Sequence, residues 1–335
     1  MRGNGLRAKL LESQLRDLLA DRFGKEIAAP APAKINLRLK VLGRRDDGYH
    51  ILSMLNCSAS LCDNVVVKLL PEPRVSLELV PSGLLHDPPE HNLAVRAYHA
   101  FWRAFDFEQA PIGALIRVEK VIPIGAGLGG GSSDAATVLR VLSGVFRTVL
   151  QGDFGLSDES YKSALVGAAL TCGADVPYFL SGGLCRVSGV GEVVEPVPGS
   201  DLLPYEVLLA VPPTPVPTRA FYDHYRAAHP MVPPALDEEL DRYIQEPERG
   251  IGGLVENDFE ADVVSMVPAV GNALAVLRGA LPGLSGLTGS GCAVFGLVPE
   301  GQDGTVDFLS AELERQGCRC FRARVLGPQA DCEVG

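Results

Sequence analysis

The sequence PIGAGLGGGSSDAA occupies Pro123–Ala136 and decides how the rest of the chain is interpreted. Five of the seven residues from Gly125 to Gly131 are glycine, and two serines and an apolar run follow them. Glycine adopts positive φ without steric cost and lets backbone N–H groups approach a ligand closely. At the start of a helix, those N–H groups and the helix dipole favour an anion. The stretch therefore predicts a loop that binds phosphate.

The flanking residues place this loop between a strand and a helix. The residues ALIRVEK, 114–120, alternate as a strand does, and the apolar residues after the loop recur at helical spacing. Ser132 and Ser133 fall where the helix should begin, so both are predicted at N-cap positions. A capped turn without a ligand is the alternative, but it leaves the entropic cost of so many glycines unexplained.

Two other nucleotide-binding motifs compete for the same residues. Gly125, Gly127 and Gly130 satisfy G-x-G-x-x-G, the dinucleotide fingerprint, and Asp153 is a candidate for its acidic partner. That alternative is weak, because Pro123 interrupts the approach to the loop and no second Rossmann half follows. A Walker A loop is excluded, since no Gly-Lys-Ser/Thr stands at the required spacing.

Composition limits the class of protein and its partners. The chain of 335 residues is 47% hydrophobic and carries a formal net charge of −11, which disfavours nucleic acid and anionic membranes as partners. It has no apolar run of about 18 residues, so no membrane span is expected. The eight cysteines form no CxxC pair, and we expect reduced thiols in a cytoplasmic protein; they are Cys57, Cys62, Cys172, Cys185, Cys292, Cys318, Cys320 and Cys332.

The chain divides into three parts. Residues 1–27 carry leucines at helical spacing between charged residues, which predicts an amphipathic helical extension. Strands and helices follow in mixed order over 28–197, and prolines cluster from Pro196 to Pro217. We therefore place a domain boundary near residue 197, with a second domain over 198–335. The order of the elements predicts an α+β fold.

Periodicity predicts the individual elements. AKINLRLKV, 33–41, alternates apolar and polar residues as a half-buried strand does. Further strands are predicted at 53–70, 74–80, 205–211 and 318–326, and helices at 90–105, 158–170, 219–228, 269–280 and 305–316.

Several motifs, taken in their order along the chain, resemble those of the GHMP kinases. They are the glycine stretch, in the form with an extra glycine before the serines, and PAKINLRLKVLGRRDDGYH (32–50), GADVPYFLSGGLCRVSGVGE (173–192), VPTRAFY (216–222), NDFE (257–260) and LTGSGCAVFG (287–296). The resemblance covers about residues 28–328 and is weaker over 53–62 and 228–256. It implies a two-domain fold, with an N-terminal domain like ribosomal protein S5 domain 2 and a ferredoxin-like C-terminal domain. It also implies an ATP-dependent kinase of a small molecule that uses Mg²⁺ and is a monomer or a homodimer.

The resemblance assigns catalytic roles to two residues. Lys34 and Asn36 lie on the same face of a predicted strand, and Asp175 lies in the apolar, glycine-rich stretch CGADVPYF. Taken alone, Lys34 is also typical of a solvated strand, and Asp175 of an aspartate that caps a turn. In the family, the matching lysine stabilises charge near the acceptor hydroxyl, and the matching aspartate is the general base. The matching asparagine lies near the substrate.

The ATP site implied by the resemblance is the glycine stretch. Its predicted residues are Pro123, Ile124, Gly125, Ala126, Gly127, Leu128, Gly129, Gly130, Gly131, Ser132 and Ser133, with Asn92 also near the nucleotide. Magnesium is implied by the chemistry of a triphosphate, and Ser132 or Ser133 would be its ligand together with the phosphates.

The acceptor implied by the resemblance carries a cytosine base, which distinguishes one branch of the family. Tyr49 would stack on the ring and His50 would bond its polar edge. Tyr222 would stack as well, or Phe221 if the register differs by one. The turn at the substrate end would be formed by Gly289, Ser290 and Gly291.

Two alternatives stay open within this resemblance. One is another GHMP kinase, which would act on homoserine, mevalonate or a sugar and would not need the cytosine-binding side chains together. The other is a catalytically silent member of the fold. Such a member should have lost Lys34 or Asp175, and both are present.

Overall fold

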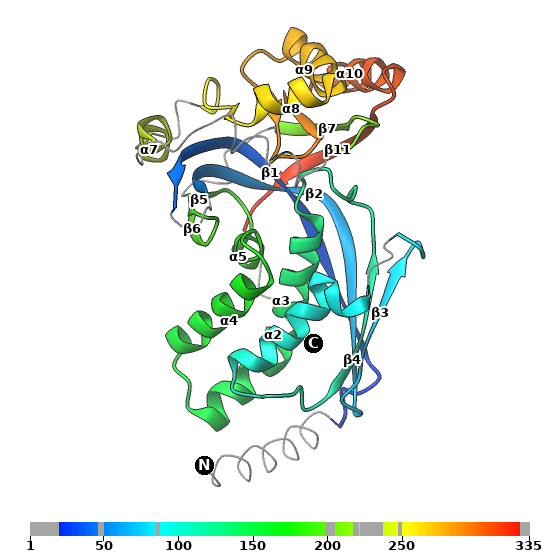
Figure 1. Ribbon diagram of the computed structural model, residues 1–335, viewed down its shortest axis with the longest axis vertical. Helices are drawn as coiled ribbons and strands as arrows, with labels where there is room; N and C mark the ends of the chain where they lie inside the picture. The colour runs from blue at the N-terminus through cyan, green and yellow to red at the C-terminus, as the bar shows by residue number, and fades with distance from the viewer. Residues whose placement is uncertain are drawn as a thin grey trace.

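The computed structural model describes residues 20–45, 50–84, 88–197, 205–216, 221, 237–246 and 250–328. Some sequence predictions lie outside these ranges: Tyr49, Tyr222, Cys332, most of the extension over 1–27 and most of the helix predicted over 219–228. The described residues form strands and helices in mixed order, as the α+β prediction requires (Figure 1).

A long antiparallel hairpin is the centre of the fold. β1 (Glu26–Arg44) pairs with β2 (His50–Leu70) along almost its whole length. The strand predicted over 33–41 is therefore only the middle of a longer one. The register shifts between Asn36 and Arg38, and such a bulge bends a strand and redirects its side chains.

Other strands extend this hairpin. β4 (Gly113–Glu119) pairs with the later half of β2, and β3 (Val75–Val80) runs parallel to β4. β5 (Cys185–Gly189) pairs with the beginning of β2, and β6 (Val193–Pro196) pairs with β5. The hairpin thus carries a partner strand at each end.

Helices pack against one another beside this sheet. They are α2 (Leu93–Ala104), which follows the short 3₁₀ helix η1 (Pro89–His91), and α3 (Gly130–Phe154), α4 (Asp158–Cys172) and α5 (Val176–Ser181) (Figure 1). The apolar residues of α2 and α3 recur at helical spacing and so form a face that the sheet and the other helices cover.

Aromatic rings fill the space between α2 and α3. Phe101 and Trp102 meet edge to face with ring centroids 5.4 Å apart, and Trp102 meets Phe146 at 4.8 Å. All three side chains are buried. This core fixes the two helices whose N-terminal ends flank the glycine loop.

A second group of strands lies toward the C-terminus. β7 (Tyr205–Val211), β9 (Ser285–Leu287), β10 (Val294–Pro299) and β11 (Arg319–Leu326) form an antiparallel sheet in the order β11-β7-β10-β9. The strands predicted over 205–211 and 318–326 agree with β7 and β11.

Helices cover this second sheet on one side. α8 (Glu260–Met266), α9 (Pro268–Ala280) and α10 (Asp303–Arg315) lie together there, and α7 (Glu238–Gln245) lies apart from them, beside the end of the hairpin (Figure 1).

Strand pairing joins the parts on either side of residue 197. The end of β11 pairs with β2, with Val325 opposite Ala59. The short strand β8 (Glu256–Asn257) runs parallel to β1 at Arg38. Segments from the C-terminal part therefore touch the hairpin directly.

Two further predictions concern the chain as a whole. Within the described ranges, no helix has both the length and the apolar character needed to cross a bilayer. The cysteines that the structure describes are all free thiols, most of them buried.

Candidate active site

The glycine stretch forms a tight loop that leads into α3. Gly125, Gly127 and Gly129 have φ of 72°, 86° and 72°, in the left-handed region that glycine adopts without strain. α3 begins at Gly130, and its N-cap is Gly129, which makes no side-chain cap. The N-cap prediction for the two serines is therefore wrong. The left-handed turn at Gly129 starts the helix earlier, so the serines lie in its first turn.

Two distant segments hold this loop. The backbone N–H of Lys34 in β1 donates to the carbonyl of Leu128 at 2.9 Å. The N–H of Ala293, before β10, donates to the carbonyl of Ala126 at 3.0 Å. The turn between β9 and β10 packs so closely that a Cβ at Gly127 would lie 2.5 Å from the carbonyl oxygen of Thr288. The loop is thus clamped between the hairpin and this turn.

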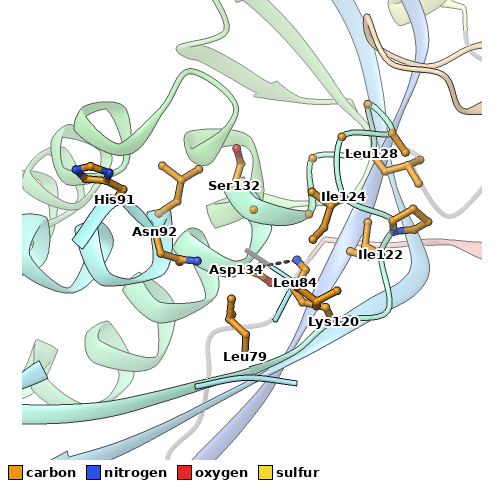
Figure 2. A pocket seen from close by; sticks show the side chains of 18 residues that line it. Leu79, Leu84, His91, Asn92, Lys120, Ile122, Ile124, Leu128, Ser132 and Asp134 are labelled. Atoms are coloured by element: carbon orange, nitrogen blue, oxygen red, sulfur yellow. Dashed lines mark hydrogen bonds and ion pairs between the residues drawn. The ribbon is translucent and has the colours of Figure 1, made fainter. Parts of the chain in front are cut away.

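A cavity of about 560 Å³ opens on one side of the loop. Its lining includes all of the predicted ATP-binding residues except Ser133, together with Leu79, Leu84, His91, Leu93, Lys120, Ile122 and Asp134 (Figure 2). Ser133 is fully buried and does not line it. The cavity therefore combines the glycine loop and a few polar side chains with leucine and isoleucine side chains. Ligand sites typically combine an apolar lining with a few polar groups in this way.

Asn92 stands at the rim of this cavity. Its side-chain oxygen accepts a hydrogen bond from the backbone N–H of Ala94 at 2.9 Å and so caps α2. The amide nitrogen of Asn92 is then the group that can face a ligand.

A second cavity of about 280 Å³ lies on the other side of the loop. Of the predicted site residues, it is lined by Lys34, Asn36, Asp175, Gly289 and Ser290, and its further lining includes Leu39, Leu52, Met54, Ala174, Val190 and Phe259. Gly127, Gly129 and Ser132 line both cavities. The loop is therefore a shared wall, and ligands in the two cavities would meet across it.

Lys34 and Asp175 form an ion pair in the smaller cavity. Nζ of Lys34 lies 2.9 Å from Oδ1 of Asp175, and the side chains are 6% and 38% exposed. Asp175 occupies the N-cap position of α5, but its side chain makes no capping hydrogen bond. The alternative role of Asp175, as an aspartate that only caps a turn, is therefore not supported. A Cβ at Gly129 would lie 3.0 Å from Cγ of Lys34, which brings the lysine against the loop.

Asn36 is fixed from both sides. Its backbone N–H donates to Oγ1 of Thr288 at 3.0 Å, and its side-chain nitrogen donates to Oδ1 of Asn56 at 2.6 Å. Asn257, in the NDFE motif, supports the same turn, because its side-chain nitrogen donates to the carbonyls of Leu287 and Gly289 at 3.0 and 2.9 Å. Sequence reasoning noted the motif but gave Asn257 no role.

The predicted cytosine-binding residues are only partly described. Tyr49 and Tyr222 lie outside the described residues. His50 begins β2 at the turn end of the hairpin, opposite Arg44, and does not line the smaller cavity. Phe221, the alternative to Tyr222, is fully buried and meets Phe259 edge to face at 5.2 Å. The role of these residues stays a prediction.

A buried cluster of charges at the larger cavity was missed by sequence reasoning. Nζ of Lys120 donates to Asp63 at 2.5 Å and to Asp134 at 2.7 Å, and Figure 2 shows the second pair. Burial raises the pKa of Asp134 to about 7; Lys120 opposes this shift and Asp63 adds to it. Asp63 also accepts hydrogen bonds from the backbone of Val121 and Ile122. The cluster therefore fixes the chain as it enters the loop.

Comparison with known proteins finds relatives over most of the chain. The family model described as the GHMP kinases N terminal domain matches residues 92–183. The 4-diphosphocytidyl-2-C-methyl-D-erythritol kinase of Anaeromyxobacter dehalogenans (strain 2CP-C) is 38% identical over 276 residues, which are 80% of each chain. The kinase of the same name from Verminephrobacter eiseniae (strain EF01-2) is 33% identical over 310 residues, 90% of this chain and 95% of the relative.

A solved structure is similar over the same length. It is described as the crystal structure of 4-(cytidine 5'-diphospho)-2C-methyl-D-erythritol kinase, and it matches with a TM-score of 0.67 and 31% identity. The match covers 90% of this chain and 100% of that one. The sequence and structure comparisons thus point to the same group of proteins.

Proposed function

Because the chain belongs to the 4-diphosphocytidyl-2-C-methyl-D-erythritol kinase family, we propose that it phosphorylates the acceptor for which that family is named. The γ-phosphoryl group of ATP would pass to the 2-hydroxyl of 4-diphosphocytidyl-2-C-methyl-D-erythritol, giving the 2-phosphate and ADP. This is a step of the non-mevalonate route to isoprenoid precursors. The observation that carries the proposal is the glycine loop between two cavities, with an ion pair of lysine and aspartate in the smaller one.

The two cavities suggest where the two substrates lie. ATP would occupy the larger cavity, with its base toward Leu79 and Leu84 and its phosphates along the loop. The acceptor would occupy the smaller cavity, beside Asn36 and Asp175. The γ-phosphate would then reach the shared wall at Gly129 and Ser132. Phosphoryl transfer depends mainly on such positioning and on neutralisation of charge.

Lys34 and Asp175 would act on the acceptor hydroxyl. Asp175 is partly exposed to the cavity and would accept the proton of the hydroxyl as its oxygen attacks phosphorus. Lys34, nearly buried and next to Gly129, would stabilise the charge that develops on the transferred group. Their contact at 2.9 Å also holds the carboxylate in one orientation before the acceptor binds.

The residues around the loop fit a magnesium ion held mainly by phosphate oxygens. Among the residues described, no group of three or more His, Cys, Asp or Glu side chains could hold a metal by itself. Ser132 lines both cavities, and Oγ of Ser133 is buried without a hydrogen-bond partner. We propose Ser132, with Ser133 beneath it, as the protein ligand. The ion would neutralise negative charge on the phosphates.

We also propose the two-domain division over 28–197 and 198–335, with the first domain like ribosomal protein S5 domain 2 and the second ferredoxin-like. The interval between the end of β6 at Pro196 and the start of β7 at Tyr205 supports the boundary. Each side has its own strands and helices.

We also propose that the protein works in a reducing compartment such as the cytoplasm, which the buried free thiols support.

An assay of ADP release against a panel of acceptors tests the proposed function. We expect rapid, Mg²⁺-dependent release with 4-diphosphocytidyl-2-C-methyl-D-erythritol, and little with homoserine, mevalonate or galactose. The alternative acceptors are not favoured, since the relatives at 33–38% identity carry the name of the cytidine acceptor. Faster turnover of another acceptor, or no turnover of the cytidine one, would overturn the proposal.

A further inference from the structure

Arg38 is a buried charge beside the wall of the smaller cavity. It lies in β1 between Asn36 and Leu39, whose side chains both line that cavity, and its own side chain is 2% exposed. Alternation along a regular strand would put Arg38 on the same face as Lys34 and Asn36. The register shift between Asn36 and Arg38 breaks that alternation, so Leu39 faces the cavity in its place.

The Arg38 side chain is directed to Asp237, at the N-terminus of α7. Nη2 of Arg38 lies 3.0 Å from Oδ1 of Asp237, and Nε lies 3.0 Å from Oδ2. Asp237 is also 2% exposed. Its carboxylate accepts a third bond from Oγ of Ser53 in β2, at 2.9 Å, and it caps α7 through the N–H of Leu240. One carboxylate therefore ties both strands of the hairpin to a segment about 200 residues away.

Further ion pairs surround this contact. The Arg38 guanidinium also donates to Glu239 at 2.6 Å, to Glu256 at 3.2 Å and to the carbonyl of Leu254 at 3.2 Å. Lys40, two residues on, pairs with Glu256 at 2.8 Å. Burial would raise the pKa of Asp237, but the hydrogen bonds from Arg38 and Ser53 outweigh it and lower the pKa, so the carboxylate is charged at neutral pH.

The cavity wall is made of residues next to this network in sequence. Leu39 follows Arg38, and Leu52 and Met54 flank Ser53. A buried ion pair is weak evidence for stability, because well-packed apolar residues of the same volume often serve equally well. A bidentate pair instead holds its two partners in one fixed geometry. Here, the pair of Arg38 and Asp237 fixes the two segments of the cavity wall, one in β1 and one in β2, against α7 and β8.

We propose that Arg38 and Asp237 are positioning residues for the acceptor. They touch neither cavity, and they act by holding the Asn36–Leu39 and Leu52–Met54 segments in the arrangement that the acceptor contacts. The inference rests on the proposed use of the smaller cavity for the acceptor. It requires that loss of the pair impairs acceptor binding and leaves ATP binding intact, because the larger cavity is built from other segments.

Two charge-removing variants, one charge-conserving variant and a control test this inference. Asp237→Asn keeps the volume of the side chain and removes its charge. Arg38→Met/Asp237→Asn removes both charges, so a failure of folding caused by one unpaired buried charge is avoided. Arg322→Met is a control for the loss of an arginine that is held by carboxylates, although Arg322 is 42% exposed and Arg38 only 2%. Arg322 is also held by three carboxylates, those of Glu206, Asp303 and Asp307, but it lies on the C-terminal sheet and lines neither described cavity.

The measurement is steady-state kinetics with each substrate varied, together with equilibrium binding of a fluorescent ATP analogue. We expect KM for the acceptor to rise about tenfold or more in both charge-removing variants, because a displaced cavity wall no longer matches the acceptor, and tenfold in affinity corresponds to about 1.4 kcal/mol of binding free energy. KM for ATP and binding of the analogue should stay within about twofold of wild type. Arg38→Lys, which keeps the charge but reaches one oxygen at a time, should be intermediate.

Either of two results would overturn the inference: an unchanged acceptor KM in the double variant, or an equal rise in KM for both substrates. Failure of the proposed function gives a different result from failure of this inference. If the wild-type enzyme turns over a different acceptor from the panel, the cytidine assignment is wrong. The effect of the variants on KM for the acceptor and KM for ATP is then measured with that acceptor. The Arg322 variant should behave as wild type in every arm.

Discussion

Replacement of Gly291 by alanine tests whether the turn between β9 and β10 sets the position of the glycine loop. A Cβ at Gly291 would overlap the carbonyl group of Ala126 and the amide nitrogen of Gly127. These are backbone atoms, so no side-chain rotation can relieve the overlap. Either the turn or the loop must move.

The size of the movement follows from the reciprocal contact. Even a Cβ at Gly127, on the facing segment, would lie 2.5 Å from the Thr288 oxygen, where ordinary contacts begin at 3.4 Å. A Cβ at Gly291 would lie closer still to Ala126 and Gly127, so for Gly291→Ala the two segments must separate by about 1 Å. A displacement of about 1 Å between reacting groups costs roughly 100-fold in rate, or about 2.7 kcal/mol. Overpacking of this kind also destabilises the fold by about 1–3 kcal/mol.

We therefore expect Gly291→Ala to fold, with a lowered Tm, and to lose about 100-fold in kcat/KM for ATP. Gly279→Ala, in α9, is the control, because a Cβ there meets no atom within 4 Å. The assay is ADP release with ATP varied, alongside thermal unfolding. A folded Gly291→Ala enzyme within twofold of wild type would show that the turn does not position the loop.

Three further predictions concern individual side chains. Asp175→Ala should lower kcat by at least about 100-fold and leave ATP binding unchanged, and near wild-type kcat would refute its role as base. Tyr49→Ala should raise KM for the cytidine acceptor and not for ATP, and an equal rise in both would contradict a cytosine-binding role. Asp134→Asn should raise Tm at pH 8 by about 3 °C or more. The pKa of Asp134 is raised to about 7 in the folded protein, so its ionisation destabilises the fold above that pH, and the gain should shrink between pH 7 and pH 4. A gain that grows toward low pH would refute this assignment.

Local patterns predicted the parts of the site that lie close together in the sequence. Alternation identified the middle of β1 as a strand, and helical spacing identified α3. The prediction that β1 is half-buried was wrong, because its polar residues Lys34, Asn36 and Arg38 are buried as well. Glycine density predicted the tight loop before α3, and binding of an anion there stays a prediction. The start of α3 was misplaced, because a left-handed Gly129 can begin a helix as well as a serine cap can. The N-cap preference of serine favoured Ser132 and Ser133, but the left-handed turn places the N-cap at Gly129.

Contacts between distant residues were beyond such patterns. Lys34 and Asp175 are 141 residues apart, and only the resemblance to a family connected them. No sequence pattern predicted the pairing of Arg38 with Asp237. An arginine in an alternating strand is typically exposed to solvent, and here the bulge in β1 directs the side chain to a buried carboxylate. From the sequence, Lys120 was predicted only as the last residue of a strand. No local pattern indicates that the carboxylates of Asp63 and Asp134 surround it.

The clamp on the glycine loop has a consequence for biosynthesis. The first segment that holds the loop, at Lys34, leaves the ribosome before the loop does. The second segment, at Thr288–Ala293, is synthesised long afterwards. The nascent chain therefore carries the glycine loop without its second support while about 160 further residues are added. A fragment that ends before β10 should contain every glycine of the motif and still bind nucleotide poorly. The order of synthesis thus delays activity until the turn between β9 and β10 has emerged.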